Sequence, residues 1–293
     1  MTLARFQKAA KSARSWSQRY RWPLTLAGAL VLIGGVAWSL SRLEFDVARL
    51  QPAYLVLVAS VLVPASIAVA AINLEILGKV VGTSIPISNA VAVTAYGRVA
   101  ELLPIPGAAL ARGAALMQSG ANLAQTTSVL IWSSLMTLAM VALFACYPLA
   151  QVHACLGVAV GGAGILGLLL TGAWFLSRSN ARIVGAMVGL RFVNVAIGVL
   201  RFWACFAAIG FGVPMDQAAV FVIASSITTY IGIVPGGLGI SEILSASLAL
   251  LIDIDPLAAF LAAAVDRIVG LAISGLVALI MISVFMKKPR KTT

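Results

Sequence analysis

The chain has 293 residues, of which 61% are hydrophobic and 10% charged, and its mean hydropathy is +1.06. Soluble domains are about 45–50% apolar and about 25% charged, so this composition excludes a soluble enzyme. The net charge of +11 does not indicate nucleic-acid binding, because ten of the twenty Lys and Arg residues lie in the first 21 and last seven positions. Charge at both ends of an apolar chain indicates membrane topology instead.

Apolar stretches long enough to cross a bilayer recur along the chain. A window of about 20 residues, the helix length that spans about 30 Å of hydrocarbon, finds six of them. They are residues 22–41, 53–78, 122–147, 151–177, 192–212 and 257–285. Two further apolar regions, 88–118 and 217–252, are interrupted by Pro and Gly. We predict an all-α polytopic membrane protein with six full spans and two re-entrant helical hairpins, related as an inverted pseudo-repeat.

The segment before the first span is basic and amphipathic. Residues 1–21 hold six Lys and Arg residues, four of them at i+3 spacing opposite an apolar stripe. This pattern fits an interfacial helix on an anionic leaflet and equally a solvated basic tail. The apolar stretch that follows exceeds the about 7–15 residues of a signal peptide, so we expect it to be retained. One transmembrane domain, 22–286, then precedes a basic tail, 287–293.

Basic residues predict the orientation, because Lys and Arg accumulate in short cytoplasmic loops. With the N-terminus inside, six spans also place the C-terminus inside. Cytoplasmic segments then hold 14 basic residues, including Lys79, Arg178, Arg182 and Arg191, whereas outer segments hold two. We therefore predict cytoplasmic N- and C-termini.

The two interrupted regions share a Pro-Gly break where a span would be mid-membrane. The residues at the breaks include Pro104, Pro106, Gly107, Pro235, Gly236 and Gly237. Proline ends one half-helix and readily begins the next. Non-helical backbone at that depth is tolerated where it lines a wet cavity, and helix N-termini attract anions. We therefore predict a midplane substrate cavity; proline kinks with packing glycines are the alternative.

Eight charged residues remain inside the apolar segments. They are Arg98, Arg112, Arg201, Arg267, Glu75, Glu101, Glu242 and Asp266. Each such charge costs at least about 2.5 kcal/mol, so these side chains should pair or line an aqueous route. Arg112 and Glu242 follow the two breaks by six and seven residues. We expect both to face one cavity and to pair across it.

The other charges suggest further partners. Arg98 and Glu101 are three residues apart, so they share a helical face and can pair locally. Asp266 and Arg267 are adjacent and point about 100° apart, so they need different partners. Arg201 lies mid-span and is a candidate for Asp266 or for a substrate phosphate.

Catalytic and metal-binding patterns are weak by comparison. The three cysteines have no CxxC spacing, and the single histidine, His153, stands in a short turn. A nucleophile–base set cannot be assembled from this inventory, so we expect no enzyme, no metal site and no cofactor. G-x-x-x-G pairs at Gly157/Gly161 and Gly185/Gly189 favour packing within the chain, with a homo-oligomer or a partner membrane protein left open.

A family resemblance rests on the two breaks. Residues 101–112 run from Glu-Leu-Leu-Pro to Leu-Ala-Arg; residues 234–242 read Val-Pro-Gly-Gly-Leu-Gly-Ile-Ser-Glu, and Asp266-Arg267 follow on the last span. From about residue 22 to 285, the chain resembles the lysylphosphatidylglycerol synthase transmembrane family. This is the flippase-like membrane half of the bacterial multiple peptide resistance factor, which also occurs alone.

The resemblance implies a lipid translocase in the bacterial cytoplasmic (inner) membrane, with Arg112 and Glu242 matching the charged motif residues. The family's first motif usually has Gly-Glu shortly before the Arg, where this chain has Ala109, Leu110 and Ala111. We also expect synthase activity to be absent, because no soluble aminoacyl-transfer domain follows Phe285.

Three function classes follow. The first is a translocase that moves an amphipathic lipid or isoprenoid-linked head group between leaflets. The second is a secondary transporter of a small polar or anionic metabolite, because inverted broken helices serve both classes. A lipid path needs lateral access from the bilayer, whereas a solute path needs a closed wall. The third is a non-transporting scaffold, in which all eight charges would pair and no cavity would exist.

Overall fold

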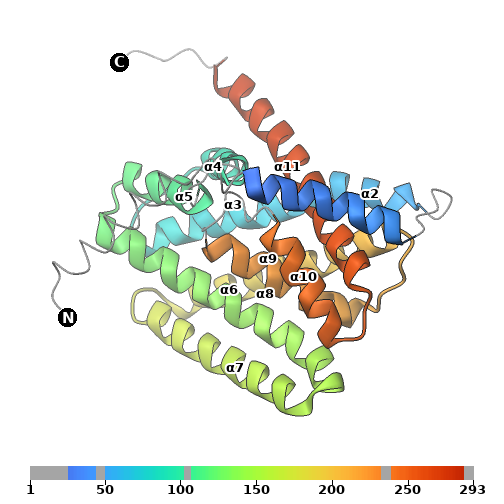
Figure 1. Cartoon of the computed structure of the whole chain (residues 1–293). Helices are drawn as coiled ribbons and strands as arrows, with labels where there is room; N and C mark the ends of the chain where they lie inside the picture. The colour runs from blue at the N-terminus through green and yellow to red at the C-terminus, as the bar shows by residue number, and fades with distance from the viewer. Residues whose placement is uncertain (1–25, 44–49, 102–106, 232–238, 287–293) are drawn as a thin grey trace.

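The computed structural model describes residues 26–43, 50–101, 107–231 and 239–286, in which every regular element is helical. An initial helix covers Leu26–Arg42. The others are α2 Pro52–Leu57, a π-helical segment Val58–Leu62, α3 Val63–Val80, α4 Ile87–Ala100, α5 Gly107–Gln118, α6 Leu123–Val152, α7 Ala154–Leu176, α8 Ala181–Ala208, α9 Met215–Ile231, α10 Ile240–Leu251 and α11 Pro256–Met286. The two interrupted regions are thus helix pairs, α4–α5 and α9–α10 (Figure 1).

Five helices in the described ranges are long and apolar enough to cross a membrane, so this is a multi-pass membrane protein. They are Pro52–Val80, Leu123–Val152, Ala154–Leu176, Ala181–Ala208 and Pro256–Val284. They confirm five of the six predicted spans. The stretch predicted at 22–41 appears as the shorter helix Leu26–Arg42, and its first four residues lie outside the described part.

The predicted start of the span 192–212 is wrong by about three helical turns. α8 begins at Ala181, because the side-chain oxygen of Asn180 accepts a hydrogen bond from the Ile183 amide at 2.9 Å and caps the helix. Arg191 therefore lies inside α8 and is buried. Arg191 is thus not a base of a cytoplasmic loop, and the count of such bases falls from 14 to 13.

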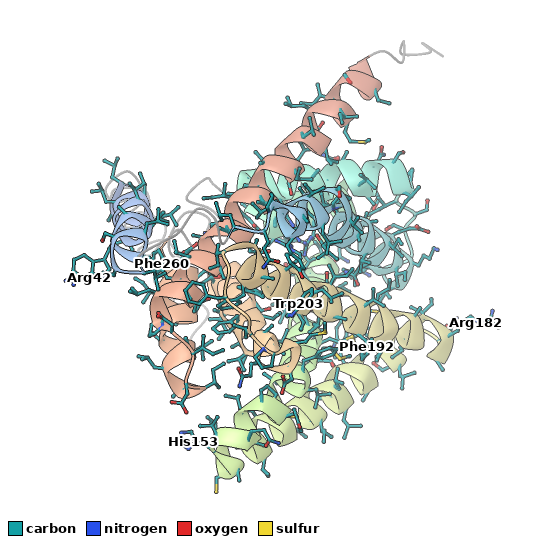
Figure 2. The ribbon with its side chains drawn as sticks, turned by 90° about the vertical axis from the view of Figure 1, so that its right-hand side faces the viewer. Arg42, His153, Arg182, Phe192, Trp203 and Phe260 are labelled. Atoms are coloured by element: carbon teal, nitrogen blue, oxygen red, sulfur yellow. The ribbon has the colours of Figure 1, made fainter. Side chains whose placement is uncertain are left out.

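The remaining loop charges separate to opposite ends of the bundle. Val80 and Val81 gather with Ala124 and Arg178 around one surface pocket, which brings three connections to the same end. At the other end, the Gln51 amide donates to the Ala208 carbonyl at 3.0 Å. Figure 2 shows Arg182 at the first end and Arg42 and His153 at the opposite one.

Acidic residues occupy the end away from Lys79 and Arg182. Asp216 follows α8, and Asp253 and Asp255 lie between α10 and α11. These two connections share an end because Arg201, seven residues before the end of α8, pairs with Asp266, ten residues after the start of α11. A basic end and an acidic end fit the charge asymmetry on which the predicted orientation rests.

Close helix packing explains several glycines. α6 and α7 lie side by side (Figure 1), and a Cβ on Gly157 would come within 2.3 Å of the Ala150 Cβ. A Cβ on Gly164 would lie 2.9 Å from the Ala139 carbonyl oxygen. The Gly157/Gly161 pair therefore serves packing within the chain. For Gly185 and Gly189 no described atom lies within 4 Å of an added Cβ.

The first hairpin is closed in the same way. A Cβ on Gly97 would lie 3.1 Å from the Ala108 Cα, and one on Gly107 would lie 2.3 Å from the Ala100 carbonyl carbon. Glycine at these positions lets the backbones of α4 and α5 approach closely on both sides of the break. The ends of the hairpin, Glu101 and Gly107, are thereby brought together.

The apolar core holds these elements in place. Buried side chains from α3, α6, α8, α9, α10 and α11 form its largest cluster. Within it Phe221 of α9 packs against Phe202 and Phe206 of α8, with ring centroids 6.0 and 5.0 Å apart. The first arm of the second hairpin is thus anchored to α8.

We predict that Gly157→Ala destabilises the protein by about 1–3 kcal/mol, the usual range for overpacking. The added methyl meets the Ala150 backbone, with 2.5 Å to its nitrogen, which a side-chain rotation cannot relieve. Gly162→Ala is the matched control, because it lies on the same helix with no described atom within 4 Å. Thermal unfolding in detergent should separate them; equal melting temperatures would contradict the packing.

Orientation is tested by cysteine labelling in a background without Cys146, Cys155 and Cys205. A cysteine at Asp253 should react with a membrane-impermeant maleimide in intact cells, because it lies at the acidic end. A cysteine at Arg178 should react only after permeabilisation. The reverse pattern would overturn the predicted orientation.

Candidate functional site

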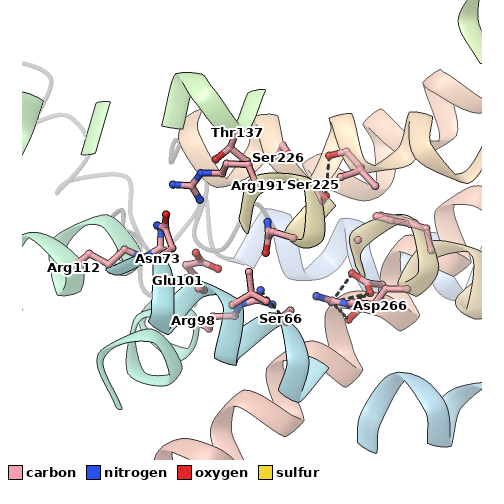
Figure 3. Close-up of a pocket in the computed structure, with 17 residues that line it drawn as sticks. Ser66, Asn73, Arg98, Glu101, Arg112, Thr137, Arg191, Ser225, Ser226 and Asp266 are labelled. Atoms are coloured by element: carbon pink, nitrogen blue, oxygen red, sulfur yellow. Dashed lines mark hydrogen bonds and ion pairs between the residues drawn. The ribbon is translucent and has the colours of Figure 1, made fainter. Parts of the chain in front are cut away.

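A polar cavity of about 210 Å³ lies between the helices at mid-span (Figure 3). Its charged lining residues are Arg98, Glu101, Arg112, Arg191, Arg201 and Asp266. Its uncharged polar lining residues are Ser66, Asn73, Thr137, Asn194, Ser225 and Ser226. The volume far exceeds the about 10–15 Å³ that one water molecule needs. The cavity can therefore hold a hydrated polar group.

The position of the lining residues sets the depth of the cavity. Ser66 and Asn73 lie in the middle of the helix that runs from Pro52 to Val80, and Thr137 lies halfway along α6. Both hairpins contribute: Glu101 and Arg112 flank the first break, and Ser225 comes from the first arm of the second. The cavity thus lies between the first helix pair, α9 and the long helices α3, α6, α8 and α11.

One charged pair closes the cavity between α8 and α11. Arg201 Nε donates to Asp266 Oδ1 at 2.8 Å, and Nη2 donates to Oδ2 at 2.9 Å. Both side chains are largely buried, 10% and 13% exposed. Bidentate charge-assisted pairs of this kind are among the strongest polar contacts in proteins. Of the two partners expected for Arg201, the structure shows Asp266.

The predicted pair of Arg112 and Glu242 is wrong. Glu242 is fully buried in the first turn of α10, and its Oε1 lies 2.8 Å from Arg267 Nε. α10 packs on α11, so the nearest base to this carboxylate is on α11 and not across the cavity. Arg112 instead lines the cavity near Glu101, which it attracts electrostatically.

The adjacent charges of α11 have different partners, as their angular separation predicted. Asp266 binds Arg201 of α8 and Arg267 binds Glu242 of α10. Two consecutive residues thus attach the last helix to the cavity wall and to the second hairpin.

Arg98 and Glu101 both line the cavity, but the local ion pair that their spacing allowed is not formed: no ion pair within 4.0 Å joins them in the described part of the chain. Arg98 Nη2 donates to Ser66 Oγ of α3 at 3.4 Å. The positive charge of Arg98 is also repelled by those of Arg201 and Arg112. Figure 3 shows Arg98, Glu101 and Arg112 on one side of the cavity and Asp266 on the other.

Other predicted site residues lie outside the described part of the chain. These are Pro106, Pro235, Gly236 and Gly237, and Pro104 belongs with them. Gly107 is described and begins α5. Neither break sequence, 102–106 or 232–238, contains a charged residue.

Sequence reasoning missed most of the cavity wall, because it named only Arg98, Glu101, Arg112, Arg201 and Asp266 among the 17 lining residues. Arg191 donates to Ser133 Oγ of α6 and lines the cavity with Asn194, Gly198 and Arg201. These positions are three, four and three residues apart, so they form one stripe on α8. A periodicity test extended back to Asn180 would have found this stripe. Ser66 and Asn73, seven residues apart on α3, give the same signal.

The Glu242–Arg267 pair generates a stability prediction. Arg267→Gln leaves a fully buried carboxylate without its cation and should cost about 3–5 kcal/mol, whereas Glu242→Gln with Arg267→Gln should cost much less. Lys79→Gln is the control, because its pair with Glu75 is 54% and 30% exposed and should contribute at most about 1 kcal/mol. Unfolding in detergent is measured for Arg267→Gln, Glu242→Gln, the double variant and Lys79→Gln; a double variant as unstable as the sum of the two single variants would refute the pairing.

Comparison with known proteins gives one match. Residues 170–278 match the family described as the lysylphosphatidylglycerol synthase TM region. The match includes the second hairpin and the α8 and α11 residues of the cavity, and it is shorter than the 22–285 expected from the motifs. No curated protein and no solved structure matches the chain. The match over residues 170–278 supports membership of the chain in the lysylphosphatidylglycerol synthase TM family.

Proposed function

We propose that this protein is a membrane lipid translocase that moves an amphipathic lipid between leaflets and is not itself an enzyme. The observation that carries the proposal is a polar cavity with four arginines at the middle of helices that can cross a membrane. The lipid head group would pass through this cavity while its chains stay in the bilayer.

Energetics support a transport role for the cavity. An arginine at the centre of a span costs at least about 2.5 kcal/mol, so such residues are retained where they pair or line an aqueous path. Arg201 is paired, but Arg112 makes no hydrogen bond or ion pair with any described residue. A side chain of this kind is available to a substrate group that enters between the hairpins.

A non-transporting scaffold predicts that all the intramembrane charges pair off and that no cavity forms. The cavity and the environment of Arg112 both disagree with that class. The matching family is described as the TM region of a lipid synthase, which supports a lipid over a soluble metabolite. The two hairpins, if both are re-entrant, would give access from opposite faces.

A secondary transporter of a small anionic metabolite is the second candidate. The observation in its favour is the size of the cavity, about 210 Å³, which suits a small anion as well as a head group. The two functions differ in one measurable property, because only the translocase changes the leaflet of a lipid.

The test uses purified protein in vesicles that contain fluorescent phosphatidic acid and phosphatidylglycerol. The wild-type protein should make inner-leaflet lipid accessible to an impermeant quencher. Arg112→Gln should slow this at least about tenfold, a loss of about 1.4 kcal/mol of head-group interaction. Arg182→Gln is the control, because it changes an arginine near the start of α8 that does not line the cavity.

Folding of each variant is checked by its melting temperature. A folded Arg112→Gln protein that moves lipid as fast as the wild type would refute the proposed role of the cavity. Uptake of a labelled phosphate solute without lipid movement would favour the metabolite transporter.

A further inference from the structure

We propose, resting on the proposed function, that the carried head group bears a doubly negative phosphate: a phosphomonoester or a diphosphate. A zwitterionic or aminoacylated head group would not fit. The charge balance of the cavity and the geometry of its arginines favour such a group.

The cavity lining has an excess of two positive charges. Four guanidinium groups face two carboxylates, those of Glu101 and Asp266. The two breaks outside the described ranges contain no Asp, Glu, Lys or Arg, so they do not change this balance. The remaining buried pair, Glu242 with Arg267, is neutral in itself. A ligand with two negative charges would bring the cavity to neutrality.

The arginines come from several directions, as a phosphate group requires. Arg98 and Arg112 extend from the two arms of the first hairpin, and Arg191 and Arg201 extend from α8. Figure 3 shows Arg112 and Arg191 extending from different helices around the cavity. Guanidinium groups match phosphate oxygens in fork geometry, and each planar group can donate two parallel hydrogen bonds.

A second observation indicates a ligand at the same place. Asn73 lines the cavity, its side chain is 4% exposed, and its Oδ1 has no hydrogen-bond partner in the described part of the chain. A buried amide without a partner is costly unless a ligand or water completes it. Next to the arginines, it can bind a hydroxyl or, with the amide turned, a phosphate oxygen.

The carboxylates are poorly placed to receive a cation. Asp266 already accepts both hydrogen bonds of the Arg201 guanidinium. Glu101 is shared electrostatically by Arg98, Arg112 and Arg267. An ammonium group would therefore meet a surplus of like charge at low dielectric, where repulsion is strong.

The experiment compares three dihexanoyl lipids that differ only in the head group: phosphatidic acid, phosphatidylglycerol and phosphatidylethanolamine. Binding to the full chain in detergent is measured at about pH 8, where a phosphomonoester with a second pKa of about 6 is doubly charged. Phosphatidic acid should bind at least about tenfold tighter than the other two. Binding of inorganic pyrophosphate and phosphate is measured in the same way, to compare soluble anions with the lipids.

Two variants move the charge balance in opposite directions. Arg112→Gln should weaken phosphatidic acid binding at least about tenfold, whereas Glu101→Gln should tighten it. Tighter binding cannot result from a folding defect, so the second variant keeps the test valid if the first is unstable. Arg182→Gln should leave all affinities unchanged.

Each outcome decides something separate. Equal or tighter binding of phosphatidylglycerol or phosphatidylethanolamine would overturn the inference while leaving lipid translocation intact. Binding of pyrophosphate as tight as that of phosphatidic acid, with no lipid movement in vesicles, would support the charge inference and overturn the lipid part of the proposed function.

Discussion

The cost of placing charge in hydrocarbon is the constraint on which this structure depends. A chain that keeps arginines and carboxylates inside apolar segments must pair them or surround them with polar groups. Here Arg201 is paired with Asp266 and Arg267 with Glu242, and the other charged side chains of the cavity are surrounded by polar groups.

Much of the fold could be predicted from composition and local pattern. Hydropathy over about 20 residues locates spans because bilayer thickness fixes helix length. The two interrupted regions were predicted correctly as helix pairs, because proline and glycine act on their own backbone whatever lies nearby. Asp266 and Arg267 were assigned different partners for the same local reason, since helix geometry alone sets the angle between neighbours.

The pairing across helices could not be predicted in this way. Arg112 and Glu242 occupy equivalent places after their breaks. However, α10 packs on α11, and this tertiary contact places Glu242 in an ion pair with Arg267. Arg191 was missed because the apolar window began after it, although the cap at Asn180 starts the helix earlier. Sequence pattern indicates which face a residue occupies, but not which helix that face meets.

The consecutive ion pairs of α11 have a mechanical consequence. Asp266 is bound to Arg201 of α8 and Arg267 to Glu242 in the first turn of α10, so a turn of α11 about its axis displaces both contacts at once. Neither pair can open by rotation of α11 while the other stays undisturbed. The position of Glu242 on α10 and that of the Arg201 guanidinium in the cavity are therefore tied to each other through one turn of α11.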